Sequence, residues 1–100
     1  MAETTGSETG WVWVWIQDPG KNDQIVGQHY EEDGISFIPT FSDKDAAQKC
    51  YHKLAKDETS KYEAQAIHYH ELIKEASKND FLIFMLNEEG EILKKIDPKK

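Results

Sequence analysis

The sequence predicts an α+β fold: a mixed, largely antiparallel sheet of five to six strands with two helices, in the order β-β-β-α-β-α-β-β. Three observations lead to this prediction. The first third of the chain alternates with a period of two, the middle repeats with helical spacing, and residues 81–86 are apolar throughout. We expect one domain over residues 11–98, preceded by a disordered leader over the small, polar residues 1–10.

The first expected strand covers residues 11–16, which are all aromatic or aliphatic β-branched residues and are followed by a turn sequence. Because the side chains of a strand point alternately to opposite faces, three indoles share one face of this strand. They belong to Trp11, Trp13 and Trp15. A second, weaker strand is expected over residues 24–30, in which Gly27 indicates a bulge or a close approach by another group.

Residues 35–38 form a third expected strand, and the short turns between the three strands favour an antiparallel meander. The apolar spacing then changes to that of a helix. Ser42 is the expected N-cap of a helix that runs from Asp43 to about Lys56. The positions that would face the core are Ala46, Ala47, Cys50, Tyr51 and Leu54.

Residues 62–68 allow two interpretations, a short strand or the beginning of a long helix over residues 61–78. Propensity favours the helix, because Glu, Ala and Gln are good helix formers. We prefer the strand, because it would supply the crossover of a sheet protein before a shorter helix over residues 71–77.

The uninterrupted apolar run at residues 81–86 is typical of a central strand that is covered on both faces. Residues 91–96 resemble an edge strand, which Pro98 ends. We expect the two helices to pack mainly on one side of the resulting sheet.

The composition narrows the classes of partner. Nineteen acidic residues against 12 lysines give a net charge of −7, and arginine is absent. Nucleic acids and anionic membranes select basic surfaces, so this charge argues against both as partners. The longest apolar runs have six residues, whereas a helix that spans a membrane needs about 20. A single cysteine excludes an intrachain disulfide and suits a reducing compartment, so we expect a cytoplasmic protein.

His68 and His70 are the candidate metal ligands, although their spacing matches no closed zinc pattern. Two residues apart on a strand, both imidazoles would lie on one face and could reach the same ion. A third ligand would have to come from a carboxylate or from His29, His52 or Cys50. If residues 68–70 are helical, the two imidazoles point apart and the site disappears.

Cys50 is the candidate nucleophile, but a reactive thiol needs exposure and a base that lowers its pKa. The expected helix places Cys50 on its core face and His52 on another face. No phosphate-binding loop, nucleophile elbow or zinc-protease helix occurs in the sequence. We therefore expect no enzyme, no catalytic residue and no cofactor.

The three tryptophans admit two interpretations. Large aromatic side chains are mostly buried, which favours a place in the core under the helices. The alternative is that the helices leave this face uncovered, in which case Trp11, Trp13 and Trp15 would form an interaction or homodimer surface.

One stretch of the chain resembles a known family. Residues 33–43, Asp-Gly-Ile-Ser-Phe-Ile-Pro-Thr-Phe-Ser-Asp, followed by an alanine-containing helix, resemble the N-terminal domain of the SseB-like (enhanced serine sensitivity) family. The polar helix at 71–77 and the strand at 81–86 are also similar, so the resemblance covers about residues 11–96. It implies an α+β domain of a bacterial cytoplasmic protein without an established catalytic centre. The family's Asn-Pro element after the last strand is replaced here by residues 86–90, and no binding residue is carried over.

These observations lead to three hypotheses of function. The first is a small, non-enzymatic bacterial cytoplasmic domain that acts as a protein-interaction or regulatory module, through a protein partner or through self-association. The second is an acidic inhibitor or immunity-type protein that masks a basic site on its target. The third, from a different class, is a metal-dependent enzyme that uses His68 and His70.

Overall fold

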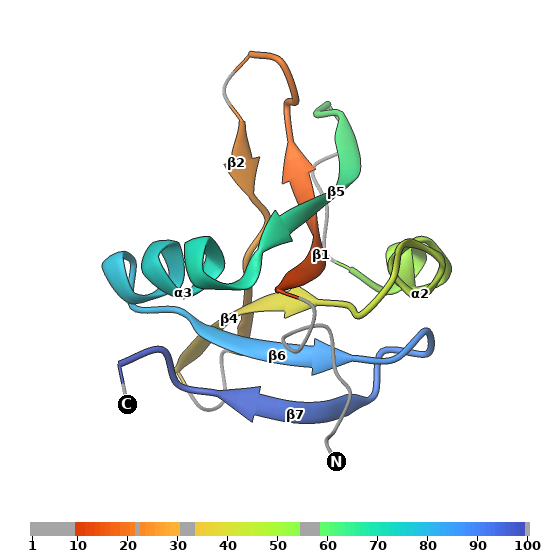
Figure 1. Ribbon diagram of the computed structural model, residues 1–100. Helices are drawn as coiled ribbons and strands as arrows, with labels where there is room; N and C mark the ends of the chain where they lie inside the picture. The colour runs from red at the N-terminus through yellow and green to blue at the C-terminus, as the bar shows by residue number, and fades with distance from the viewer. Residues whose placement is uncertain (1–9, 22, 31–33, 55–58, 100) are drawn as a thin grey trace.

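The computed structural model of the chain describes residues 10–21, 23–30, 34–54 and 59–99. These residues form an α+β fold with two α-helices and seven strands, which confirms the predicted fold class (Figure 1). The elements are β1 (Trp11–Gln17), β2 (Gln24–Ile25), β3 (Gln28–Tyr30), β4 (Ile35–Thr40), α2 (Lys44–Cys50), the 3-10 helix η1 (Tyr51–Lys53), β5 (Tyr62–His68), α3 (Tyr69–Lys78), β6 (Leu82–Leu86) and β7 (Ile92–Ile96). The expected leader lies outside the described residues except for Gly10.

The strands form two sheets instead of the single sheet that we predicted. One has the order β2-β1-β5 and is antiparallel; the other has the order β3-β4-β6-β7, with β4 and β6 parallel. The difference arises at Val26 and Gly27, which interrupt the expected second strand. As a result β2 pairs with β1, whereas β3 pairs with β4. The meander prediction is therefore wrong.

Gly27 has a steric reason to be glycine. The ring of Phe81 lies directly against its backbone, and a Cβ atom at this position would overlap the ring. The close approach that the sequence indicated at Gly27 is confirmed.

The two sheets meet at β1. The Trp13 backbone N–H donates to the Phe41 carbonyl at 2.8 Å, and the Phe41 N–H donates to the Trp13 carbonyl at 2.9 Å. Strand β1 thus contacts β5 along one edge and, along the other, both β2 and the end of β4.

The helices cover opposite sides of β1, not mainly one side as we predicted (Figure 1). On the α2 side, the core contains Trp15, Val26, Phe37, Phe41, Ala47, Cys50, Ala64, Phe84 and Leu86. On the α3 side, it contains Val12, Val14, Ile16, Ile38, Leu72, Ala76, Ile83 and Met85. The physical reason is that both faces of β1 are apolar, so each face requires a cover.

Three further expectations concern the later elements. Strand β6 contributes to both cores and is the predicted central strand, and β7 is the predicted edge strand. The strand interpretation of residues 62–68 is confirmed by β5, with α3 beginning at Tyr69. No helix in the described part of the chain is long and apolar enough to cross a membrane.

Helix α2 begins one residue later than we predicted. The N-cap is Asp43, whose carboxylate accepts from the Ala46 backbone N–H at 2.8 Å, and not Ser42. The α-helix ends at Cys50 and continues as η1 to Lys53, so it is shorter than the predicted helix, whose last residues fall among the undescribed positions 55–58.

Candidate functional site

The structure separates the three tryptophans by their burial. Trp11 is 53% exposed, Trp13 is half-buried and Trp15 is only 6% exposed. The gradient arises because α2 packs over one end of the face that they share and leaves the other end uncovered. The core interpretation therefore holds for Trp15, whereas Trp11 lies on the surface.

Trp15 is fixed by a polar and an aromatic contact. Its indole N–H donates to the carbonyl oxygen of Ala47 on α2 at 3.3 Å. The indole also packs against the Tyr51 ring, with the ring centroids 4.5 Å apart. A buried indole whose N–H has found an acceptor is typical of a structural tryptophan.

Trp13 lies at the border of the covered region. The Lys44 ammonium, in the first turn of α2, stands 5.9 Å from the centroid of its ring, which is the geometry of a cation–π contact. Ala66 of β5 lies directly opposite Trp13 in the register and is exposed.

Trp11 is exposed but held in place. It pairs with His68 in the register of β1 and β5, and the His68 ring meets the indole edge-to-face with centroids 5.5 Å apart. The preceding carbonyl, of Gly10, accepts from the Tyr69 N–H at 2.7 Å and ties this end of β1 to the start of α3. We call the group formed by Trp11, Trp13, Ala66 and His68 the tryptophan surface.

Ala66 and His68 were not assigned to this surface by the sequence, because their membership depends on the pairing of β1 with β5. The alternation of small residues at Ala64 and Ala66 was the available signal: small side chains on one strand leave room for large ones on its neighbour.

His68 and His70 lie on either side of the end of β5. The strand ends at His68, and His70 lies in the first turn of α3, so the two residues do not share a strand face. Their rings are nevertheless neighbours, with centroids 5.3 Å apart. The Nδ1 atom of His68 accepts from the His70 backbone N–H at 3.3 Å, which gives His68 the role of helix N-cap. In the described part of the chain, no three His, Cys, Asp or Glu side chains are arranged so that they could hold a metal ion.

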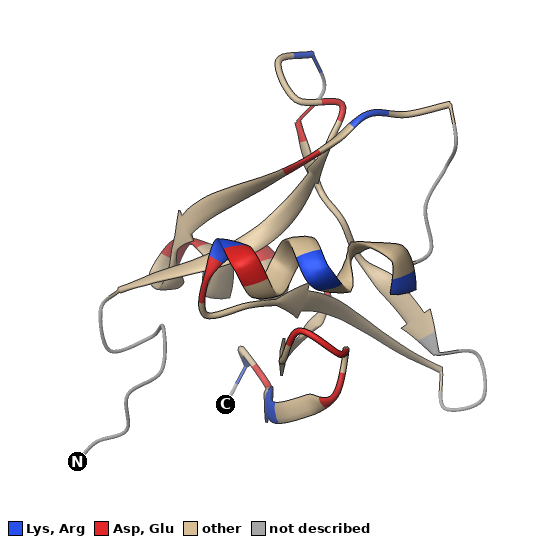
Figure 2. Ribbon diagram, turned by 90° about the vertical axis from the view of Figure 1, so that its right-hand side faces the viewer, with Lys and Arg blue, Asp and Glu red and all other residues tan. Residues whose placement is uncertain are grey.

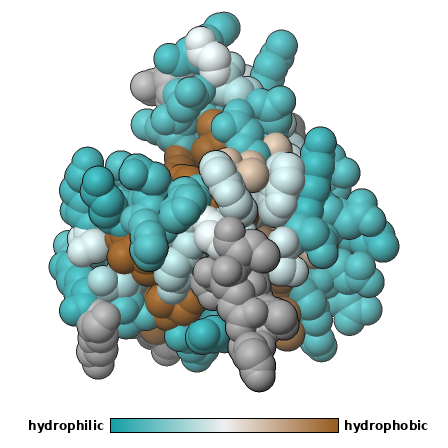
Figure 3. All heavy atoms as spheres, viewed as in Figure 1, coloured by the Kyte–Doolittle hydropathy of each residue, from teal (hydrophilic) through white to brown (hydrophobic). Residues whose placement is uncertain are grey.

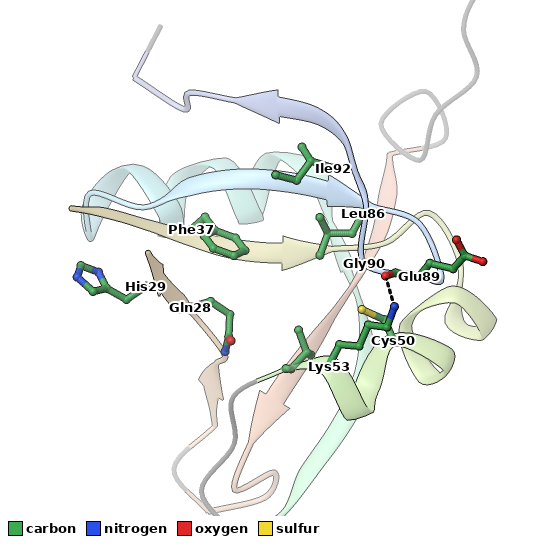
Figure 4. A pocket seen from close by; sticks show the side chains of 10 residues that line it. Gln28, His29, Phe37, Cys50, Lys53, Leu86, Glu89, Gly90 and Ile92 are labelled. Carbon is green, nitrogen blue, oxygen red and sulfur yellow. Dashed lines mark hydrogen bonds between the residues drawn. The ribbon is translucent and has the colours of Figure 1, made fainter. Parts of the chain in front are cut away.

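Cys50 forms part of the wall of a cavity of about 200 Å³ between α2, β3, β4 and the β6–β7 turn (Figure 4). Its thiol is buried, and burial raises its pKa, with the Lys53 ammonium offsetting part of the rise. This environment disfavours the thiolate that a nucleophile requires. Figure 4 shows the His29 ring at the opposite end of the cavity from the Cys50 sulfur, and the His52 side chain is exposed.

Beside this cavity, two contacts join α2 and η1 to the β6–β7 turn. The Lys53 ammonium donates to the Glu89 carbonyl at 2.6 Å, as drawn in Figure 4. Lys49 and Glu88 form an exposed ion pair at 3.3 Å. A Cβ atom at Gly90 would stand 3.5 Å from the Cys50 sulfur, which is an ordinary van der Waals distance. The contacts around the cavity thus serve the packing of α2 on the turn.

The surface charge is distributed unevenly among the elements. Figure 2 shows acidic and basic residues intermixed along α2, which faces the viewer there. The β6–β7 turn carries three glutamates, at positions 88, 89 and 91. Each ion pair among the described residues joins two exposed side chains, so each contributes little to the stability of the fold.

Comparison of the chain with models of protein families, with curated proteins and with solved structures finds no match in any of the three. The resemblance of residues 33–43 to the SseB-like N-terminal domain therefore stays a prediction.

Proposed function

We propose that the protein is a small, non-catalytic protein-interaction or regulatory module whose tryptophan surface contacts a partner protein. The observation that carries the proposal is Trp11, an indole that is 53% exposed although its backbone lies within a paired strand. Tryptophan is among the residues most enriched at the centres of protein interfaces, where it supplies a large apolar area and one hydrogen-bond donor.

The way in which Trp11 is held supports the proposal. The strand pairing and the Gly10–Tyr69 hydrogen bond fix its backbone, and the edge-to-face His68 ring restricts its indole before any partner arrives. A side chain that is already ordered loses little conformational entropy on binding, so more of its contact energy remains as affinity.

The cellular location and the family of the protein are part of the same proposal. The resemblance at residues 33–43 supports a bacterial cytoplasmic protein of SseB-like type, and the single cysteine is consistent with a reducing compartment.

Affinity capture followed by measurement of the purified pair tests the proposal. We expect Trp11→Ala and Trp13→Ala to weaken partner binding at least tenfold, because truncation of a central interface tryptophan typically costs about 2 kcal/mol or more. Leu93→Ala is the matched control, because Leu93 is 65% exposed and lies on β7, the edge strand of the other sheet. It should leave the affinity unchanged.

Two results would argue against the proposal. One is a partner that binds wild type and both tryptophan variants with equal affinity. The other is equal weakening by Leu93→Ala, which would indicate nonspecific hydrophobic association. If sedimentation velocity shows a homodimer that Trp11→Ala dissociates, the tryptophan surface keeps its proposed role and the partner is a second copy of the chain.

The net charge of −7 favours a second candidate, an acidic inhibitor or immunity-type protein that masks a basic site. Charge attraction between exposed groups is screened over about 10 Å at 0.1 M salt. The affinity for such a target should therefore fall steeply with salt concentration, and a salt-insensitive complex would argue against this candidate.

A further inference from the structure

The largest recess among those that we find in the described part of the chain lies on the opposite face of β1 from the tryptophan surface. It is a groove of about 590 Å³ between the β1–β2 hairpin and α3. This volume is within the range of about 300–1,000 Å³ that is typical of binding sites. Figure 3 shows brown, apolar atoms in the recess between the teal atoms of the hairpin and those of α3.

The groove combines an apolar floor with an acidic rim. Its floor is formed by Ile16, Ile25, Ile38 and Phe81. The rim carries two carboxylates, Asp23 beside β2 and Glu75 on α3, and no lysine is among its described lining residues. A site of this kind favours a ligand in which positive charge adjoins an apolar group.

The floor is kept in shape by the close packing of Phe81 on Gly27. Because Gly27 has no side chain, the ring lies against the backbone between β2 and β3 and forms part of the floor. The Phe81 backbone N–H donates to the Ala76 carbonyl at 2.8 Å, which fixes the residue to the end of α3. The apolar part of the groove is therefore built from anchored residues.

The two carboxylates differ in their present partners. Asp23 accepts from the Gly20 backbone N–H at 2.6 Å, which orients its side chain within the hairpin turn. Glu75 stands 3.7 Å from the Lys78 ammonium, with 44% of the glutamate side chain exposed. Such an exposed pair within a helix is worth a few tenths of a kcal/mol, so a ligand cation can compete with it.

We propose that this groove binds a basic, apolar segment of a partner protein, in which lysine or arginine alternates with a large apolar residue. The carboxylates come from separate elements, whereas the apolar floor extends between those elements. A chain of alternating side chains can supply cations to both carboxylates and an apolar group to the floor. This inference does not require the tryptophan surface and adds a second site to the molecule.

Titration of the ¹⁵N-labelled full chain with blocked pentapeptides tests the inference. The probe is acetyl-Lys-Leu-Lys-Leu-Lys-amide, and the controls replace every lysine by glutamate or every leucine by serine. We expect only the lysine–leucine peptide to shift the amide signals of Ile25, Glu75 and Phe81.

Charge-neutralising variants then test the carboxylates. Glu75→Gln and Asp23→Asn should each weaken binding about fivefold, which corresponds to about 1 kcal/mol. Glu71→Gln is the matched control. Glu71 forms the same type of pair, with Lys74 at 4.0 Å, one turn earlier on α3, but it does not line the groove. It should leave binding unchanged, and so should Trp11→Ala.

Each contrary outcome would overturn the inference. One such outcome is that about 1 mM of the lysine–leucine peptide shifts no amide signal at the groove. The others are that the serine peptide binds as tightly as the lysine–leucine peptide, and that Glu71→Gln weakens binding as much as Glu75→Gln does. Shifts that centre on the tryptophan surface instead would also overturn it, while leaving the proposed function intact. All of these variants change exposed or partly exposed side chains, and circular dichroism establishes that each one is folded.

Discussion

Trp11 and Trp15 lie on the same face of the same strand, but only Trp15 is covered by α2. Truncating each of them therefore separates the stability that comes from packing against α2 from the stability that comes from the strand alone. Trp15→Ala removes an indole that is 6% exposed, together with its hydrogen bond to the Ala47 carbonyl. Replacing a buried Phe or Trp by Ala typically lowers the free energy of unfolding by about 3–5 kcal/mol. The total stability of a small domain is about 5–15 kcal/mol, so this variant should lose a large share of it.

Trp11→Ala should cost much less. With 53% of the residue exposed, about half of an aromatic surface of roughly 200 Å² is removed from water. At about 25 cal/mol per Å² this burial is worth about 2.5 kcal/mol, and the true value is smaller because the unfolded chain also buries part of it. We expect a loss of about 1–2 kcal/mol.

Urea denaturation followed by far-ultraviolet circular dichroism measures both losses without depending on the fluorescence of the substituted residues. Wild type and both variants should unfold with similar m-values, which establishes that a shift in midpoint is a shift in stability. Equal destabilisation by Trp11→Ala and Trp15→Ala would refute the reasoning, because it would mean that α2 does not produce the difference in burial.

Three other changes test separate parts of the fold. Gly27→Ala should lower the free energy of unfolding by about 1–3 kcal/mol, because the new methyl group displaces the Phe81 ring; a neutral effect in thermal denaturation would contradict this contact. Asp43→Ala should lower the free energy of unfolding by about 1 kcal/mol through loss of the N-cap, whereas Ser42→Ala should have little effect. A larger loss for Ser42→Ala in urea denaturation would show that Ser42, as predicted from the sequence, is the N-cap. Burial raises the pKa of the Cys50 thiol, so the unfolded chain loses this proton at a lower pH than the folded chain does. The free energy of unfolding should therefore fall as the pH rises above about 8.5, and this fall should be smaller in Cys50→Ala; parallel slopes over this pH range would contradict the assignment.

Periodicity was sufficient to predict most of the elements. The alternation in β1, the continuous apolar run of β6 and the helical spacing around Ala47 and Cys50 each reflect contacts with a core, which leave a repeating pattern in the sequence. The strand at residues 62–68 was harder, because its intrinsic propensity favours a helix. Pairing with β1 decided the outcome.

The arrangement of the elements could not be predicted in the same way. At the interruption, Gly27 packs against the ring of Phe81, which is far away in the sequence, and β2 and β3 on its two sides belong to different sheets. The exposure of Trp11 depends on where α2 ends its cover, and no local pattern records this. The groove lies between the β1–β2 hairpin and α3, which are far apart in the sequence, and no sequence motif marks it.

The parallel pairing of β4 with β6 has a consequence for the way in which the chain folds. Residues 37–40 join residues 82–85 side by side, although two helices and β5 lie between them in the sequence. The entropy of closing so long a segment must be lost before the contacts between these strands are gained. High contact order of this kind slows two-state folding, so we expect refolding in milliseconds to seconds, with β4 and β6 joining late.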